Sequence, residues 1–425
     1  MQLKLLKEKV IFRDIKNRDS SQGSRIIIDG KEYINFSSND YLGLANHPAL
    51  LRASQRAIKK FGFGSGASRL LCGGSILHEE LEKKIARFKG TESALVFNSG
   101  YAANTGIIPA IAEEGDAIFS DELNHASIVD GCRLSRAKKI IYRHKDIGHL
   151  KELMKKEIAL YRSGGHSELV SESHTHKTAN RASSDKMLNQ VQHDSIGGPK
   201  YIIVTDSVFS MDGDIAPLKE LYELCFTLNS LPSAPCSILL YIDDAHATGV
   251  LGKGKGSLEH FGIKPEPWII QMGTFSKALG SFGAFVAGSK DTIEFILNTT
   301  RSFIFSTALP PCIIAASIAA LELIEKKPVL IKKLWSNRDK AAKGLTKLGY
   351  DIMGSETPII PVKTGSIENT LKTSRYLLKK GIFAPAIRPP TVKEPRIRIT
   401  VTAAHSDKDI EQLIENIKGI KKNTR

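Results

Sequence analysis

Apolar residues recur along this chain with two alternating periodicities. Leu77, Leu81, Ile85 and Phe88 follow one another at intervals of four, four and three residues, which predicts an amphipathic helix that Gly90 ends. Short apolar runs rich in β-branched residues predict strands at 93–97, 117–120, 138–143, 200–205, 237–243, 268–274 and 283–289. Because helical stretches separate these runs, we expect an α/β fold with a mostly parallel sheet flanked by helices.

Changes in pattern divide the chain into three parts. Residues 1–61 are expected to form an N-terminal arm, 62–305 a large α/β domain, and 306–425 linking helices and a smaller C-terminal α+β domain. Residues 163–198 interrupt the large domain with a polar stretch that lacks any periodicity, so we expect a mobile surface insertion. Its His174 and His176 have no evident third ligand, and a metal site is not expected.

Composition and charge narrow the class of protein. The 425 residues carry 60 Lys and Arg against 45 Asp and Glu, a net charge of +15, and 41% of them are hydrophobic. Such a chain can bury a large core, and its charge favours acidic partners such as phosphorylated cofactors, an acidic carrier protein or nucleic acid. Nucleic-acid binding is not favoured, because the lysines are dispersed over helix faces and aromatic residues make up only 7%.

A cytoplasmic location is expected. The longest apolar stretch, 312–323, is shorter than the roughly 20 residues that span a bilayer and contains Ser317 and Glu322. The N-terminus alternates charged and apolar residues, unlike an export signal. The five cysteines form no CxxC pair, which argues against a disulfide framework or a zinc site.

Four polar stretches follow predicted strands, where open α/β sheets bind ligands. They are 98–104, 205–214, 243–252 and 273–283. Ser99, Gly100 and Tyr101 begin a helix directly after a strand, and such helix amides can hold a phosphate, although any strand-to-helix turn favours these residue types. Lys277 stands among small residues rather than among charges, as an amine kept available for a carbonyl would.

The third stretch contains an acidic pair at a strand end. Asp243 could hold a protonated ring nitrogen, with His246 near a ring hydroxyl, or Asp243 and Asp244 could bind Mg²⁺. A phosphate cradle, then a strand-end carboxylate, then a lysine 34 residues later is the layout of a fold-type I pyridoxal 5'-phosphate (PLP) enzyme.

Longer phrases make the chain resemble one family, the α-oxoamine synthases. They cover about 35 to 405 apart from the insertion, and they are NFSSNDYLGLANHP, FGFGSGASRLLCGG, LNHASIVDG, TDSVFSMDGDIAPL, DDAHATGVLG, GTFSKALGSFGAFVAGS, FIFSTALPP and AIRPPTV followed by RIRITVTAAH. The resemblance implies a PLP-dependent acyltransferase that condenses an amino acid with a thioester and releases CO₂. SSNDYLGL, SFGAFVAGS, FSTALPP and AIRPPTV match the alanine-using branch, with a pimeloyl thioester of CoA or acyl-carrier protein, better than the glycine-using 5-aminolevulinate synthase or 2-amino-3-ketobutyrate CoA ligase.

The same resemblance implies roles for individual residues. Lys277 would bind the cofactor aldehyde and take the substrate proton, Asp243 would pair with the ring nitrogen, His246 would contact the phenolic oxygen, and His125 would stack on the ring. Ser207 would lie beside the ring. The remaining cofactor contacts would reach the phosphate, and they are Ser99, Gly100, Tyr101, Thr274, and, across a homodimer interface, Ser306 and Thr307.

Substrate contacts are implied less sharply. Arg396 matches the arginine that holds the amino-acid carboxylate, but the linker before it is about two residues shorter than in the family, which leaves Arg398 as an alternative. Asn39 and Arg13 match positions expected near the substrates.

Overall fold

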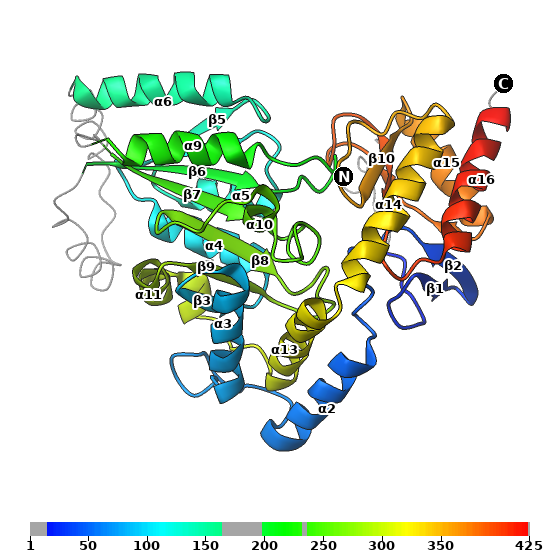
Figure 1. Cartoon of the computed structure of the whole chain (residues 1–425), viewed down its shortest axis with the longest axis horizontal. Helices are drawn as coiled ribbons and strands as arrows, with labels where there is room; N and C mark the ends of the chain where they lie inside the picture. Colours follow the sequence, from blue (N-terminus) through cyan, green and yellow to red (C-terminus); the bar gives the residue numbers. More distant parts are fainter. Residues whose placement is uncertain (1–14, 164–197, 232–235, 424–425) are drawn as a thin grey trace, which may run out of the picture.

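A computed structural model describes residues 15–163, 198–231 and 236–423 (Figure 1). Its larger part is built on a seven-stranded sheet. The strands, in spatial order, are β3 (Ser93–Phe97), β9 (Ala284–Gly288), β8 (Ile269–Thr274), β7 (Ser237–Asp243), β6 (Lys200–Asp206), β4 (Ala117–Asp121) and β5 (Lys138–Tyr142). Within this sheet β9 alone runs against its neighbours, so the predicted α/β fold with a mostly parallel sheet is confirmed.

Helices cover both faces of this sheet, because its inner strands bury side chains on both sides. In β6, Ile202 and Val204 pack on one face, whereas Tyr201 and Ile203 pack on the other. The first face carries α4 (Gly100–Ile111), α5 (Ala126–Leu134), α11 (Lys290–Thr299) and α12 (Arg301–Ile304). The second face carries α6 (Ile147–Arg162), α9 (Leu218–Asn229) and α10 (Ser257–Phe261).

Three further helices form one group beside the large sheet, in which the last contacts the other two. They are α2 (Pro48–Phe61), α3 (Ile76–Lys89) and α13 (Pro311–Lys326), which share one apolar cluster. The amphipathic pattern of 77–88 is confirmed as α3, and Gly90 ends it in a left-handed conformation with φ +71°. The apolar stretch 312–323 is the buried α13, and across the described ranges we find no helix long and apolar enough to cross a membrane.

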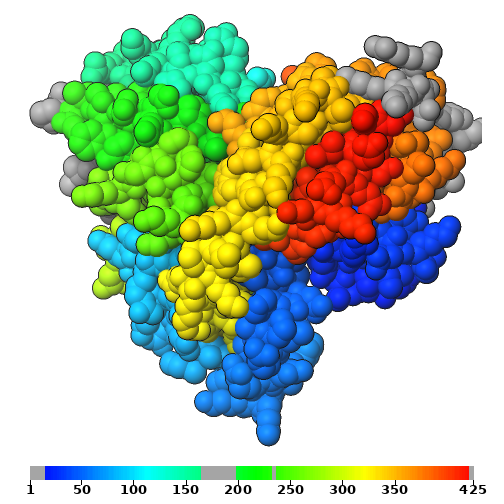
Figure 2. Space-filling model, turned by 45° about the vertical axis from the view of Figure 1, so that its right-hand side comes forward, coloured from blue at the N-terminus to red at the C-terminus, as the bar shows by residue number. Residues whose placement is uncertain are grey.

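The smaller part contains two three-stranded sheets. They comprise β1 (Arg25–Ile28), β2 (Lys31–Asn35) and β11 (Ile382–Phe383), and β10 (Ile359–Lys363), β13 (Arg396–Thr400) and β12 (Ala386–Ile387). Their helices are α14 (Val329–Lys347), α15 (Ile367–Lys379) and α16 (Asp407–Asn423). Figure 2 shows α14 and α16 side by side on the surface of this part. Because β2 pairs with β11, the N-terminal strand pair and the last third of the chain share one sheet.

The two parts meet where the central strands end. Figure 1 shows β6 and β7 pointing with their carboxyl ends toward the part that holds β10. Thr357, just before β10, donates to the carbonyl of Gly213 in the segment after β6, at 2.9 Å. Most of the predicted insertion, including His174 and His176, lies outside the described residues, as does Arg13.

Candidate active site

Asp243 is the last residue of β7 and lies buried at the carboxyl edge of the sheet. Its carboxylate accepts from the side-chain amide of Asn104 in α4 at 2.8 Å and from the backbone amide of Ala245 at 2.9 Å. The Asn104 carbonyl in turn accepts from the Tyr241 hydroxyl at 2.8 Å. Asn104 and Ala245 therefore fix the direction of the carboxylate, and Tyr241 in turn fixes Asn104.

Lys277 follows β8, the strand that pairs with β7 beside Asp243, and the two groups influence each other electrostatically. Burial lowers the pKa of its amine, and the charge of Asp243 works against that shift. Burial raises the pKa of Asp243, while Lys277 and the Asn104 amide work against that shift. An amine with a lowered pKa is neutral for a larger share of the time at neutral pH, as addition to a carbonyl requires.

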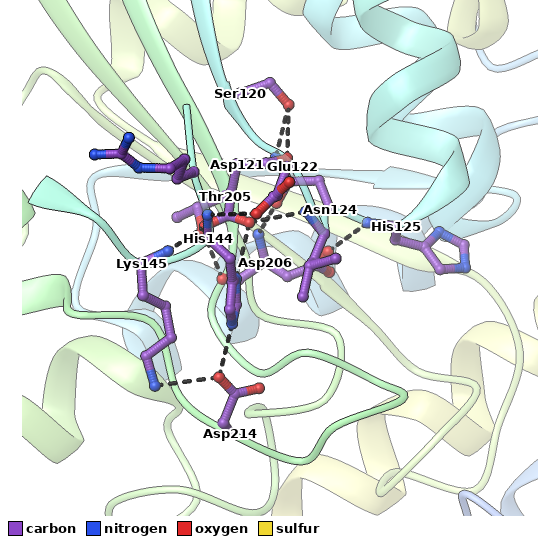
Figure 3. Close-up of polar contacts among 12 residues, drawn as sticks. Ser120, Asp121, Glu122, Asn124, His125, His144, Lys145, Thr205, Asp206 and Asp214 are labelled. Carbon is purple, nitrogen blue, oxygen red and sulfur yellow. Dashed lines mark hydrogen bonds and ion pairs between the residues drawn. The ribbon is translucent and has the colours of Figure 1, made fainter. Parts of the chain in front are cut away.

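His125 lies at the start of α5, where its ring caps the helix by accepting from the backbone amide of Ser127 at 3.3 Å. Its own backbone amide donates to the Asp206 carboxylate at 2.6 Å, a contact drawn in Figure 3. The pKa of His125 is lowered by burial and responds to both Asp243 and Lys277, so the ring lies near both groups. An imidazole kept neutral and anchored at its backbone can present a flat face to a ring.

His246 lies one turn beyond Asp243 and is held by Tyr41. The Tyr41 hydroxyl and Nδ1 of His246 are 2.7 Å apart, and both side chains are buried. Burial lowers the pKa of His246 well below its ordinary value, with Lys277 and Arg398 lowering it further. The other ring nitrogen of a neutral His246 is left to contact a ligand.

The predicted phosphate contacts separate into two groups. Ser99 caps α4 by accepting from the Ala102 amide at 3.1 Å, and the amides of Gly100 and Tyr101 belong to the first turn, which has no intrahelical carbonyl to bind. The Thr274 hydroxyl is buried and donates to the Gly283 carbonyl at 2.8 Å, so it stabilises the turn that carries Lys277.

Ser306 and Thr307 follow α12 and lie beside the segment 65–69 of the same chain. Thr307 pairs with Ser68, and its carbonyl accepts from the Asn98 side chain at 2.8 Å. This places them next to the strand end that precedes Ser99. Ser207, in contrast, is fully buried and donates its hydroxyl to the backbone carbonyl of Asp243 at 3.0 Å.

The two candidate arginines of β13 have different surroundings. Arg396 forms an ion pair with Asp212 and donates to the Met211 carbonyl at 3.2 Å. Arg398 donates to the Asn39 side chain at 3.0 Å and to the Ser210 carbonyl at 2.6 Å. Among the described residues, the partners of Arg398 are neutral groups, which also include the Thr400 hydroxyl at 2.8 Å, whereas Arg396 is paired with a carboxylate.

Asp244 is committed to a different partner from Asp243. Its carboxylate lies 2.7 Å from the amine of Lys89 in α3, and both side chains are almost fully buried, at 0% and 1% exposed. It also accepts from the Ser257 amide at 3.1 Å. The two adjacent carboxylates therefore point into different environments, and of the two only Asp243 shifts the pKa of Lys277.

The structure thus brings together His125, Asp243, His246, Lys277 and the helix start at Ser99 from distant parts of the chain. The sequence analysis missed three supporting residues, Asn104, Asp206 and Tyr41. Each stands within a stretch that the sequence analysis had already singled out, at the end of NSGYAAN, in TDSVFS and in NDYLGL. The sequence does not show that these residues lie close to a reacting group, because the fold creates that proximity only when the strands align.

These groups fit PLP. A helix start suits the phosphate, and a buried carboxylate suits a protonated ring nitrogen. A half-buried amine of lowered pKa suits the aldehyde, and a neutral imidazole suits the ring face.

Comparisons with known proteins point to the same class of PLP enzyme. The family model for aminotransferase class I and II matches residues 31–417. An 8-amino-7-oxononanoate synthase of Geotalea daltonii is 47% identical, covering 98% of this chain and 95% of its own. A serine palmitoyltransferase from S. paucimobilis, solved with a bound PLP–myriocin adduct, superposes with a TM-score of 0.82 at 26% identity, over 99% of this chain and 96% of that one. An 8-amino-7-oxononanoate synthase structure from Francisella tularensis gives 0.70 at 25% identity, over 92% and 98%.

Proposed function

The chain belongs to the class I and II aminotransferase family, and we propose that it catalyses the reaction of an 8-amino-7-oxononanoate synthase in biotin biosynthesis. In that reaction L-alanine condenses with a pimeloyl thioester of CoA or acyl-carrier protein and releases CO₂ and the free thiol. The observation that carries the proposal is the buried Asp243, fixed by Asn104 and Ala245 at the end of β7, with Lys277 in the turn that follows the neighbouring strand β8.

PLP, when bound, supplies the electron sink for loss of the alanine Cα proton. Asp243 would keep the ring nitrogen protonated, because a buried carboxylate without a cation is unfavourable and a cation beside it is favourable. Lys277 would hold the aldehyde carbon and, once displaced by the amino acid, take the Cα proton as a neutral amine. His125 would cover one face of the ring and exclude water from it.

We propose Arg398, rather than Arg396, as the group that holds the alanine carboxylate. Arg398 donates to neutral groups and is oriented by Asn39, so a substrate carboxylate there would meet a fixed guanidinium whose charge no described carboxylate pairs. Arg396 is already paired with Asp212 and would position the neighbouring segment. Asn39 would then act beside the substrate, as the sequence predicted.

A cytoplasmic homodimer is part of the proposal. Three large apolar side chains in the segments 63–71 and 305–307, which pair at Ser68 and Thr307, are exposed in the single chain: Phe63 at 73%, Leu71 at 80% and Phe305 at 71%. A partner subunit covering them would bring its own Ser306 and Thr307 next to the site. All five cysteines lie in the described ranges and are unpaired, as expected in a reducing compartment.

One set of assays tests the proposed function. Purified protein supplied with PLP should absorb in the visible range, and borohydride should fix the cofactor to a peptide containing Lys277. Release of thiol and CO₂ should be fastest with L-alanine and pimeloyl-CoA among alanine, glycine and serine combined with pimeloyl-, succinyl-, acetyl- and palmitoyl-CoA. Preference for glycine with succinyl- or acetyl-CoA would establish a glycine-using synthase instead. Attachment of the cofactor to another lysine would refute the role of Lys277.

A further inference from the structure

His144 lies between two carboxylates at the carboxyl edge of the large sheet. Its Nδ1 is 2.9 Å from the Asp121 carboxylate, and its Nε2 is 2.9 Å from the Asp214 carboxylate (Figure 3). The ring also meets the Phe209 ring edge-on, with centroids 4.4 Å apart. Both ring nitrogens are therefore engaged by groups from two different segments.

The first segment, 121–125, carries His125 to the site. Asp121 accepts from the Leu123 amide at 2.9 Å, and His144 donates its own backbone amide to Glu122 at 3.1 Å. Asn124 donates to the Val204 carbonyl at 2.8 Å. These contacts define the path of the chain from the end of β4 to His125.

The second segment, 207–217, reaches the arginines of β13. Asp214 stands in a tight loop, in which the Phe209 amide donates to the Asp214 carbonyl at 3.1 Å. Between these two residues lie the carbonyls of Ser210 and Met211, which accept from Arg398 and Arg396 respectively. Displacing Asp214 would therefore displace the acceptors that aim both guanidinium groups.

The charges around the ring favour its protonated form. Asp121 and Asp214 face its two nitrogens, Glu122 faces its backbone, and Lys145, which also binds Asp214 at 3.1 Å, is the cation on the same side. The ring is partly buried, but these carboxylates raise the pKa of His144 to about 9. At neutral pH it is a cation with two anionic partners, a stronger clamp than a neutral ring would be.

We propose that His144 is a positioning residue for the reaction, tying the segment that presents His125 to the segment that orients Arg398 and Arg396. This inference rests on the proposed function, because it assigns Arg398 to the amino-acid carboxylate. The His144 ring would contact neither the substrate nor the cofactor. Its effect is on where the carboxylate of the amino acid is held.

Replacing His144 should weaken amino-acid binding more than cofactor binding. His144→Gln keeps a polar side chain but cannot carry charge or bond both carboxylates, so the 207–217 segment loses an anchor. A shift of the arginines by a fraction of an ångström is expected to raise the dissociation constant for L-alanine by about fivefold to a hundredfold. The absorption spectrum of PLP bound to His144→Gln should differ little from that of PLP bound to the wild type.

The measurement is a titration of PLP-loaded protein with L-alanine alone, followed by the change in cofactor absorbance. It needs no turnover, so it remains readable if the thioester substrate has been assigned wrongly, and thiol release by the wild type tests the function separately. His149→Gln is the matched control, because His149 lies in α6 and accepts from the Arg143 amide at 3.0 Å without touching Asp121 or Asp214. Asp214→Asn breaks the same clamp from its other end.

The outcomes separate positioning from a structural role. The proposal requires weakened alanine binding in His144→Gln and in Asp214→Asn, and normal binding in His149→Gln. The double variant should bind L-alanine no more weakly than the single variant with the larger dissociation constant. The dissociation constant of His144→Gln for L-alanine, divided by that of the wild type, should also fall as pH rises through about 9, where the wild-type ring loses its proton. Should both clamp variants bind alanine within about twofold of wild type, or lose only thermal stability, the proposal is overturned.

Discussion

The side-chain amide of Asn104 donates to Asp243 at 2.8 Å, and the same amide group reaches the Ser127 hydroxyl at 2.8 Å. One residue of α4 thus links the end of β7 to the start of α5, where His125 lies. Asn104 is fully buried, and so is the Tyr241 hydroxyl group that it accepts from. The three hydrogen bonds of Asn104 fix the carboxylate of Asp243, which we propose to pair with the ring nitrogen of PLP.

Asn104→Ala is therefore expected to harm both stability and the cofactor site. Leaving the buried partners of Asn104 unsatisfied should lower the free energy of unfolding by about 2–4 kcal/mol. Loss of the amide also removes a group that lowers the pKa of Asp243, so its carboxylate should hold the ring nitrogen less firmly. Urea unfolding gives the first effect, and titration of the visible cofactor band gives the second.

Asn337→Ala is the control for this prediction. Asn337 is equally buried, in α14, where it donates to the carbonyls of Thr402 at 3.0 Å and His405 at 2.8 Å, far along the chain from the cofactor residues. It should lose similar stability with an unaltered cofactor titration. Identical titrations for both variants would mean that Asn104 has only a structural role.

The sequence predicted the strands of the large sheet and the helix at 77–88 because those depend on local patterns. Short continuous apolar runs identify the buried strands, a period of 3.6 residues identifies the helix, and strand ends identify where a ligand is expected to bind. It could not decide between Arg396 and Arg398, which are two residues apart in one strand. That distinction depends on what the 207–217 segment presents to each, which is a tertiary contact.

His144 was missed for the same reason. In the sequence His144 is a single polar residue shortly after β5, with nothing to mark it out. Asp121 and Asp214 lie 23 and 70 residues away from it. Only the pairing of β4 with β5 and with β6 brings the three together. The division at 61 and 305 and the mobility of 163–198 stay predictions.

The buried ion pair of Lys89 and Asp244 should be costly to break from one side. Lys89→Met leaves a carboxylate at 0% exposure without its cation, and we expect a loss of about 3–5 kcal/mol in the free energy of unfolding. Lys83→Met, in the same helix, removes an exposed pair with Glu79 and should cost no more than about 1 kcal/mol. Urea unfolding compares the two.

A second variant shows whether the loss comes from the charge. In Lys89→Met with Asp244→Asn no unpaired anion remains, so the double variant should be more stable than Lys89→Met alone. If the double variant loses as much free energy of unfolding as the two single variants together, Lys89 acts through packing and not through neutralisation of Asp244.

The pH dependence of stability should reveal the clamp at His144. Its pKa is raised from 6.5 to about 9 in the folded state. A raised pKa means that folding favours the protonated ring, so its stabilising contribution is fully present below pH 6.5 and is lost as pH rises through about 9. The contribution is at most about 3 kcal/mol, and less because the side chain is 22% exposed.

Urea unfolding of wild type and His144→Gln at several pH values between about 6 and 10 isolates this contribution, because other titrating groups cancel in the difference. The difference should be largest at the acidic end and approach a constant, smaller value above pH 9. A difference that stays the same across the range would show that the ring is neutral in the folded protein.

The turn that carries Lys277 packs against the segment that carries Tyr41, and Gly280 is the point of contact. It has φ +62°, and an added Cβ would lie 2.3 Å from the Ala45 nitrogen and 2.4 Å from the Leu44 carbonyl carbon. Gly280→Ala should therefore separate the two segments, displace Lys277 from Asp243 and lower turnover by at least about tenfold. Backbone strain alone would have no such effect on turnover.

Gly30→Ala separates strain from contact. Gly30 lies in the turn between β1 and β2 with φ +71°, and nothing lies within 4 Å of an added Cβ. It should cost about 1–2 kcal/mol in the free energy of unfolding and leave kcat unchanged, because only the left-handed conformation is penalised. Gly280→Ala should lose more stability than this and also bind L-alanine differently, since Tyr41 holds His246. Equal losses in the two variants, with normal turnover in Gly280→Ala, would mean that the segment 41–45 yields to the methyl group and that its contact with the lysine turn does not set the geometry of the site.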